Sequence, residues 1–277
     1  SRSSGRSSTR EASNTARMLL RPDDREALER LAVFPGDFDR AAAREVAGMD
    51  LATLARLVDA SFVALGGGGR YRMHPLVRQY LGERLAARPD DLRELEAGYD
   101  AHYLTRLDRL VTEVRGGRQK EAFAAIDLDL DNFRAVWRRA LANVEAPLLS
   151  RLALAIETYY VQRHRAREGV DVLQGAIDVL DAERPEHRGV LGDLLVKQGW
   201  LHLRLGRYDE AAVRGLPLLR AASDARGAME GLNLQGSVAG LTSRLDLSKE
   251  RFEEALALAR EVGSDAMIAR YTNNPVS

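Results

Sequence analysis

The segment from Leu31 to Leu85 constrains the fold most strongly, because its periodicity changes twice. Its three informative stretches are LAVFPGDFDRAAAREVAG, LATLARLVDASFVAL and RYRMHPLVRQYLGERL. Apolar residues recur at helical spacing through the first part, two short extended runs follow on either side of four glycines, and helical spacing then returns. The segment therefore predicts three short helices, a hairpin and a fourth helix.

Polar residues before the helices support these boundaries. Asp23 and Glu26 form a capping-box-like start for the first helix, which the breaker Phe-Pro-Gly at 34–36 ends. Asp39 can cap a second helix that stops at Gly48, and Asp50 can cap a third. The residues that we expect to face inward on the first and third helices are Leu28, Leu31, Ala32, Leu51, Leu54 and Val58.

The glycines from 66 to 69 lie between the two extended runs, 61–65 and 70–73. A phosphate-binding loop would need a Lys-Ser or Lys-Thr pair after the glycines and a helix behind them, and neither follows. His74 precedes Pro75, and proline is favoured at the first helical position, so we expect His74 to cap the fourth helix. Three helices, a hairpin and a helix in this order predict a winged-helix domain.

Composition narrows the class of protein. The chain has 277 residues, 45% of them hydrophobic, with 41 basic and 41 acidic side chains. Balanced charge gives no long-range attraction to nucleic acid or to an anionic membrane. The chain contains no cysteine and no apolar run long enough to span a bilayer. We therefore expect a soluble cytoplasmic protein with no membrane partner, in which residues 1–17 form a disordered leader.

The second half of the chain predicts paired helices that repeat. Gly199 and Gly236 lie 37 residues apart, and each follows an apolar helix with another amphipathic helix behind it, which is typical of a tetratricopeptide-like superhelix. Gly215 stands where this pattern has a bulky residue, and Ser243 and Ser248 replace a glycine and an alanine. We expect a mainly α protein with a winged-helix domain at 18–90, a helical connector at 91–150, and repeats at 151–277 that are truncated at the C-terminal end.

The sequence resembles a known class of regulators. LAVFPGDFDRAAAREVAG, LVDASFVAL and YRMHPLVRQYLGERL are similar to the winged-helix segment of STAND-class signal-transduction ATPases. These are the NB-ARC and NACHT-like relatives found in bacterial LuxR-type and SARP-type transcriptional regulators. DLDLDNFRAVWRRAL resembles the helical region that joins the winged helix to the tetratricopeptide sensor in this family. The ATPase module is missing, because no G-x-x-x-x-G-K-[ST] motif and no acidic Walker B strand occur in the chain.

The resemblance implies a nucleotide contact for one residue. In the family, a Met-His-Asp motif at the end of the wing places its histidine against the β-phosphate of ADP. The matching residues here are Met73, His74 and Pro75, so the aspartate is replaced by proline. The resemblance therefore implies that His74 contacts ADP only in a parent protein that contains the ATPase module, while this chain alone binds no cofactor. The alternative is that His74 only caps its helix.

Other residues offer little catalytic chemistry. The remaining histidines lack a partner at ligand spacing, and the sequence contains no G-x-S-x-G turn, so we expect neither a metal site nor an enzyme. A partner surface is suggested by one cluster of basic and aromatic residues, for which a solvated helix end is the alternative. The cluster consists of Tyr159, Tyr160, Arg163, Arg165 and Arg167.

These observations lead to a regulatory hypothesis with two rivals. By resemblance, the winged helix is an intramolecular clamp on an ATPase module, and the repeats bind a protein or a small-molecule inducer. One rival is a winged helix that binds DNA directly; the third predicted helix argues against it, since Arg56 is its one basic residue and is offset by Asp59. The other rival is a free-standing tetratricopeptide scaffold for protein–protein interaction.

Overall fold

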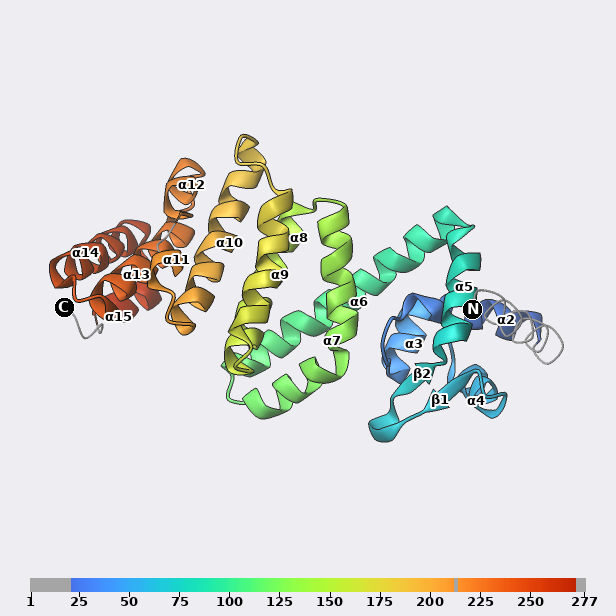
Figure 1. Cartoon of the computed structure of the whole chain (residues 1–277). Coiled ribbons are helices and arrows are strands. Elements are labelled where there is room, and N and C mark those ends of the chain that lie inside the picture. The colour runs from blue at the N-terminus through green and yellow to red at the C-terminus, as the bar shows by residue number, and fades with distance from the viewer. Residues whose placement is uncertain (1–20, 212–213, 273–277) are drawn as a thin grey trace, which may run out of the picture. The chain divides into compact units, whose positions relative to one another are not determined.

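The N-terminal part of the structure contains the predicted order of elements. The computed structural model describes residues 21–211 and 214–272, and the chain divides into two compact units, up to Val136 and from Trp137 onward. In the first unit three helices precede an antiparallel hairpin, and a fourth helix follows it (Figure 1). These elements are α2 (Pro22–Arg30), continued by the 3₁₀ turn η1 (Leu31–Val33), α3 (Arg40–Ala47), α4 (Leu51–Asp59), β1 (Val63–Leu65), β2 (Tyr71–Met73) and α5 (Pro75–Ala86).

Two of the three predicted aspartate caps are confirmed. The Asp39 carboxylate accepts a hydrogen bond from the Ala42 amide at 2.8 Å, and the Asp50 carboxylate accepts one from the Thr53 amide at 2.7 Å. The predicted start of the first helix is wrong, since α2 begins at Pro22 after Arg21 and Asp23 lies in its first turn. Proline has no backbone N–H, so a helix that begins at Pro22 needs one hydrogen-bond acceptor fewer at its start. The helix can therefore begin before Asp23, the residue predicted to cap it.

One predicted inward residue of α4 is also wrong. Leu51 is 47% exposed, whereas Leu54 and Leu57 are buried. Leu51 is the first residue of the helix, and the core is reached only one turn later. The buried face therefore follows the spacing of Leu54 and Leu57 and does not include the helix start.

The hairpin is short and has a glycine tip. Val63 pairs with Met73 and Leu65 pairs with Tyr71. The tip is a 3₁₀ turn, η2 (Gly67–Gly69), in which Gly68 and Gly69 have φ of +68° and +73°, values that side chains with a Cβ avoid. Phe38, in the loop before α3, forms an isolated antiparallel bridge with Tyr71 of β2. This bridge, which the sequence did not predict, fixes the loop before α3 against β2.

The core of the first unit extends beyond the hairpin domain, which we define as residues 22–86. The long helices α6 (Pro89–Arg115) and α7 (Gln119–Ala142) follow α5. Tyr99 and Tyr103 of α6 are fully buried, and their rings lie 5.5 and 6.4 Å from that of Phe34. Phe34 also stacks on Phe38 at 4.5 Å. Because these rings share one core, α6 is part of the same compact unit as the hairpin domain.

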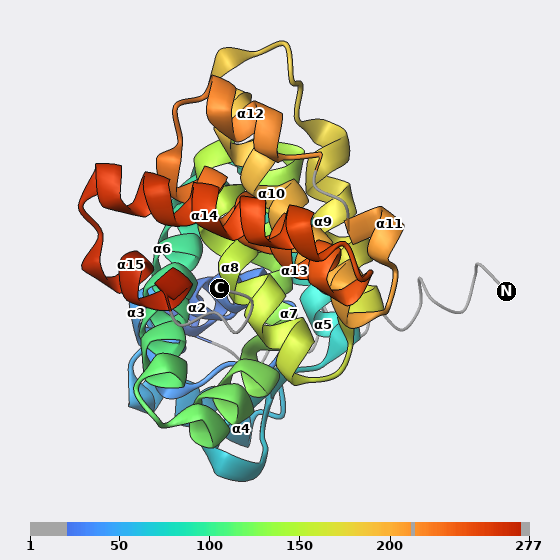
Figure 2. The same cartoon turned by 90° about the vertical axis from the view of Figure 1, so that its left-hand side faces the viewer.

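The second unit consists of paired antiparallel helices, as predicted, and the described part of the chain after residue 92 contains no strand. Figure 2 views these helices with α14 and α15 nearest the reader. α8 packs on α9 and α10, α10 packs on α11, α12 and α13, and α14 packs on α13 and α15. The helices are α8 (Ala146–Gln162), α9 (Ala166–Val179), α10 (Pro185–Arg204), α11 (Tyr208–Ala211), α12 (Leu216–Ala221), α13 (Ala225–Leu241), α14 (Leu245–Val262) and α15 (Asp265–Thr272).

The repeat glycines lie where helices approach closely. A Cβ on Gly199 would come within 2.5 Å of the Leu234 side chain, and one on Gly236 would come within 2.9 Å of the Phe252 ring. Ser248, at the position of the expected alanine, is fully buried and its hydroxyl donates to the Gly236 carbonyl at 2.8 Å. The serine therefore fits the close crossing because its one polar group is satisfied.

The pair that starts with α10 departs from the regular repeat. Its second helix is divided into α11 and α12, and Gly215 precedes α12. A Cβ on Gly215 would lie 2.4 Å from the Gly192 carbonyl oxygen of α10, which is too close for any side chain. The missing bulky residue at 215 is thus explained by direct backbone contact between the helices.

Some expectations fall on residues that the structure does not describe. The leader at 1–17, the first residues of the domain predicted from 18 and the last residues of the repeats predicted to 277 lie outside 21–211 and 214–272. Within the described residues no helix is both long and apolar enough to cross a membrane.

Candidate functional site

His74 lies at the N-terminus of α5, as the sequence predicts. Its Nδ1 accepts a hydrogen bond from the Leu76 amide at 3.3 Å, so the imidazole is the helix cap. Since Nδ1 is the acceptor, the neutral ring carries its proton on Nε2. The side chain is exposed, and Leu76 beside it is 43% exposed. The N–H of Nε2 and the positive end of the α5 dipole are therefore accessible to an anion, with Pro75 in the first turn.

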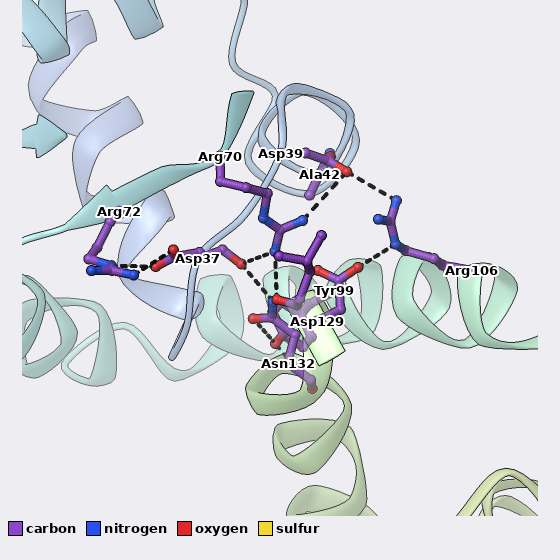
Figure 3. Close-up of polar contacts among 10 residues, drawn as sticks. Asp37, Asp39, Ala42, Arg70, Arg72, Tyr99, Arg106, Asp129 and Asn132 are labelled. Carbon is purple, nitrogen blue, oxygen red and sulfur yellow. Dashed lines mark hydrogen bonds and ion pairs between the residues drawn. The ribbon is translucent and has the colours of Figure 1, made fainter. Parts of the chain in front are cut away.

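A buried charge network joins the hairpin to α7 (Figure 3). The Arg70 side chain, which precedes β2, is 7% exposed, and its Nη2 donates to the Asp129 carboxylate at 2.6 Å. The same nitrogen donates to the main-chain oxygens of Asp37 at 2.6 Å and Leu128 at 3.0 Å. Asp129 of α7 is 1% exposed. One guanidinium thus links the middle of α7, the loop before α3 and the hairpin.

Arg106 and Asp39 complete this network. Arg106 of α6 lies between two carboxylates, with Nη1 3.0 Å from Asp39 and Nε 2.5 Å from Asp129. Burial opposes ionisation of Asp39, but the Ala42 amide and the charges of Arg106 and Arg70 outweigh it and lower the pKa of Asp39. The carboxylate is therefore ionised at neutral pH and serves both as the α3 cap and as a partner for α6.

Neutral groups fill the remaining positions around the network. The Tyr99 hydroxyl donates to the Asn132 side-chain oxygen at 2.9 Å, and the Asn132 amide donates to the Asp37 carbonyl at 2.8 Å. Burial, reinforced by the charge of Asp129, raises the pKa of the neighbouring Tyr103 hydroxyl. The charges of the network are paired, so it is suited to holding elements together. The buried Arg70 Nε and the Tyr103 hydroxyl have no hydrogen-bond partner among the described residues.

Three basic residues of the hairpin domain are engaged by other groups of the protein. Arg72 forms a bidentate pair with Asp37 at 2.6 and 2.7 Å, and Arg78 donates to the Pro35 carbonyl. Arg56, the basic residue of α4, pairs with the buried Asp24 at 2.6 Å. The charges of Arg56 and Arg72 are therefore neutralised within the first unit, whereas Arg78 is bonded to an uncharged carbonyl group.

A second polar cluster lies on α8, α10 and α13. Lys197 pairs with Asp193 one turn earlier on α10, and Glu230 of α13 pairs with Arg270 at 2.5 Å. Glu157 of α8 faces this cluster without a hydrogen bond or ion pair to any described residue. Burial raises the pKa of Glu157 to about 7, since the charge of Lys197 only partly offsets it and the charges of Glu230 and Asp193 reinforce it. Glu157 thus titrates near neutral pH.

The predicted partner surface near the α8–α9 turn is only partly available. Tyr159 and Tyr160 are buried, at 4% and 3% exposure, and their rings pack edge to face. Arg165 forms a bidentate pair with Glu168 and lies 5.7 Å from the Tyr160 ring centre. Arg167 is exposed, and Arg163 is partly buried. The tyrosines therefore contribute packing, and a partner surface formed by the arginines stays a prediction.

Among the described residues, no group of three or more His, Asp or Glu side chains could hold a metal ion. Two of the other histidines lie beside a carboxylate. His102 lies 2.8 Å from Glu45, and His202 lies 3.2 Å from Glu210. Burial is the main reason that the pKa of His202 is lowered.

The sequence is similar to regulators from mycobacteria. Mb0914c of Mycobacterium bovis and Rv0890c of Mycobacterium tuberculosis, named as candidate HTH-type transcriptional regulators, are each 27% identical over 88% of this chain. The chain spans about 29% of the length of these relatives. No family model matches the sequence.

A comparison with solved structures matches a protein from Pyrococcus horikoshii. It is a signal-transduction ATPase with numerous domains (STAND) that has a tetratricopeptide repeat sensor. The match covers 90% of this chain and 46% of the other, with 15% sequence identity and a TM-score of 0.34. The fold of the present chain, mainly α with a small hairpin and helical repeats, is established by its own elements.

Proposed function

We propose that this chain is the non-catalytic regulatory part of a cytoplasmic, bacterial STAND-type ATPase that controls transcription. In this proposal the hairpin domain is a winged helix that acts as an intramolecular clamp on an ATPase module. The repeats form an arm that binds a protein or small-molecule inducer. The chain itself carries no catalytic residue and no cofactor, and ATP or ADP would be held by the ATPase module together with His74.

The observation that carries this proposal is the exposed His74 on a rigidly held helix start. A free imidazole N–H at a helix N-terminus is suited to contact a phosphate. Arg70 and Asp129 fix the hairpin to α7 by charge-assisted hydrogen bonds, so His74, one residue after β2, has a well-defined position. The similarity to mycobacterial regulators supports a role in transcription.

The test is replacement of His74 by alanine in a full-length protein that contains the ATPase module. Loss of one hydrogen bond to a phosphate is worth about 1.5–3 kcal/mol. ADP should therefore dissociate about 10- to 100-fold faster. If the closed and open states differ by only a few kcal/mol, the variant should also signal without inducer. The measurements are the ADP dissociation rate and the inducer-independent transcriptional output.

Asp50→Ala provides the matched control. Asp50 is also an exposed N-cap, and its loss costs a helix cap of about 1 kcal/mol without removing a nucleotide contact. The control should leave ADP release and basal output unchanged. If His74→Ala behaves like Asp50→Ala in both assays, His74 is only a cap and the clamp proposal is wrong at this residue.

Direct DNA binding by the hairpin domain is the second candidate, favoured by the names of the mycobacterial relatives. Against it, Arg56, Arg70 and Arg72 are already paired with carboxylates. We expect weak association with duplex DNA that disappears steeply with salt and shows no sequence preference. Fluorescence anisotropy at physiological salt, with DNA from the promoter region and a scrambled duplex, is the measurement; a preference for the promoter sequence would favour the DNA-binding candidate over the clamp.

A further inference from the structure

The second unit contains a cavity that belongs to neither cluster described above. It has a volume of about 420 Å³ and lies among α12, α13 and α14. Its deepest wall is formed by Leu219, Ala228 and Leu232, which are themselves buried core residues. Cavities of this size that combine an apolar wall with a few polar groups are typical of sites for small organic molecules. An apolar group that entered would therefore contact the core directly.

The cavity lies where the repeat pattern is interrupted. α11 and α12, the two parts of the second helix of this pair, span four and six residues, whereas α14, the equivalent helix of the next pair, spans 18. The close approach of Gly215 to Gly192 places α12 against α10, and Gly227 allows Leu219 to pack on the start of α13. Departures from a regular pattern occur preferentially at functional or strained sites. The broken helix thus gives this pair a cavity beside α14.

The charges around the cavity determine which ligand fits it. Arg220 pairs with Glu254 across the gap between α12 and α14, and the other oxygen of Glu254 accepts from Arg251 at 2.9 Å. Asp224 caps α13 through the Gly227 amide at 2.8 Å, so its carboxylate already occupies the positive end of that helix. Glu261 has no ion pair with any described residue.

Glu261 therefore provides the uncompensated charge of the cavity. It lies in the last turn of α14, where the helix dipole also favours a cation. The Arg220 guanidinium, which could attract an anion, is occupied by Glu254. An anionic ligand would have to displace this ion pair, whereas a cationic ligand would not.

We propose that this cavity binds a small amphipathic cation. An alkyl or aryl group occupies the wall formed by Leu219, Ala228 and Leu232, and an ammonium group pairs with Glu261. This inference rests on the proposed function in that it names the chemical class of the inducer, but binding can be measured on the chain itself. A failure of the amphipathic cation to bind can therefore be distinguished from a failure of His74 to retain ADP in a full-length protein.

The experiment uses three probes of matched shape with the complete 277-residue chain. They are 4-phenylbutylamine, 4-phenylbutan-1-ol and 5-phenylpentanoate, which differ in the charge of the terminal group. Isothermal titration calorimetry measures affinity, and the methyl resonances of Ala225, Ala228 and Ala257 report where the probe binds. We expect the amine to bind about tenfold more tightly than the alcohol, with shifts of these methyl groups, and the carboxylate to bind most weakly.

Two variants and a control identify the site. Glu261→Gln should reduce the affinity for the amine about tenfold and leave the alcohol unaffected. Ala257→Trp should fill the cavity and weaken both probes, with retained folding checked by circular dichroism. Glu253→Gln, on the same helix but 66% exposed and paired with Lys249, should change neither. An undetectable amine interaction at millimolar concentration, equal binding of amine and carboxylate, or an unaltered Glu261→Gln affinity would each overturn the inference.

Discussion

Replacing Asp129 by alanine is expected to lower the free energy of unfolding of the first unit by about 3–5 kcal/mol. The change removes one of the two carboxylates beside Arg70 and Arg106, so the two guanidinium groups are left to share Asp39 and one buried positive charge loses its partner. An unpaired buried charge costs far more than a lost surface pair. Urea denaturation followed by near-ultraviolet circular dichroism, which reports on the packed Tyr99 and Tyr103, measures the loss.

Asp131→Ala is the matched control for this prediction. Asp131 is two residues further along α7, is 69% exposed and lies 3.6 Å from Arg134. Exposed pairs of this kind contribute between about 0 and 1 kcal/mol, so this variant should unfold close to the wild type. Similar losses for the two variants would show that Asp129 is no more than an ordinary surface charge.

Glu157→Gln is expected to stabilise the second unit at pH 8 by about 1–3 kcal/mol. The folded-state pKa of Glu157, about 7, is above the ordinary value of 4.5, so the folded protein binds this proton more tightly than the unfolded chain. The stabilisation that this proton provides is complete below pH 4.5 and is lost as the pH rises through 7. Glutamine keeps the shape of the side chain without a charge, so it avoids this loss.

The pH dependence distinguishes this effect from a simple change of packing. The difference between Glu157→Gln and the wild type should be largest at pH 8 and disappear towards pH 4.5, as measured by urea denaturation with tryptophan fluorescence from Trp137 and Trp200. Glu253→Gln, at a 66% exposed position, should show no such pH-dependent difference. A gain that is the same at both pH values would contradict the raised pKa.

The local features of the first unit could be predicted from sequence because each depends on neighbouring residues. Asp39, Asp50 and His74 cap helices whose first turns follow immediately, and the glycines at 66–69 provide the turn between two short strands. The errors at Asp23 and Leu51 concern helix ends, where a proline or a single turn shifts the boundary. Such positions depend on contacts that periodicity does not contain.

The buried network was missed because its members are distant in sequence. In the sequence, Arg70 has the pattern of an exposed basic residue of the hairpin. In the structure it is buried against α7. A signal was nevertheless present, since Ile126, Phe133 and Val136 are buried at helical spacing and Asp129 occupies the same face. An acidic residue in an apolar stripe indicates a buried partner of opposite charge, although it does not say which arginine that partner is.

In the repeats, too, local features could be predicted from the sequence and contacts between distant residues could not. The period of 37 residues predicts paired helices, and Gly199 and Gly236 lie at the expected crossings. The division of the second helix into α11 and α12 depends on the contact between Gly215 and Gly192, which no local pattern reveals. The burial of Tyr159 and Tyr160 was likewise hidden, because an aromatic pair beside arginines has the same sequence whether it faces solvent or the core.

The contact between Arg70 and Asp129 also affects how the chain completes folding during synthesis. The two residues are 59 positions apart, so at typical elongation rates Arg70 waits about 3–12 s before its partner is made. Until then the hairpin would have to bury a cation without its carboxylate. The nascent hairpin domain is therefore expected to stay loosely packed on the ribosome and to reach its final form only when α7 emerges.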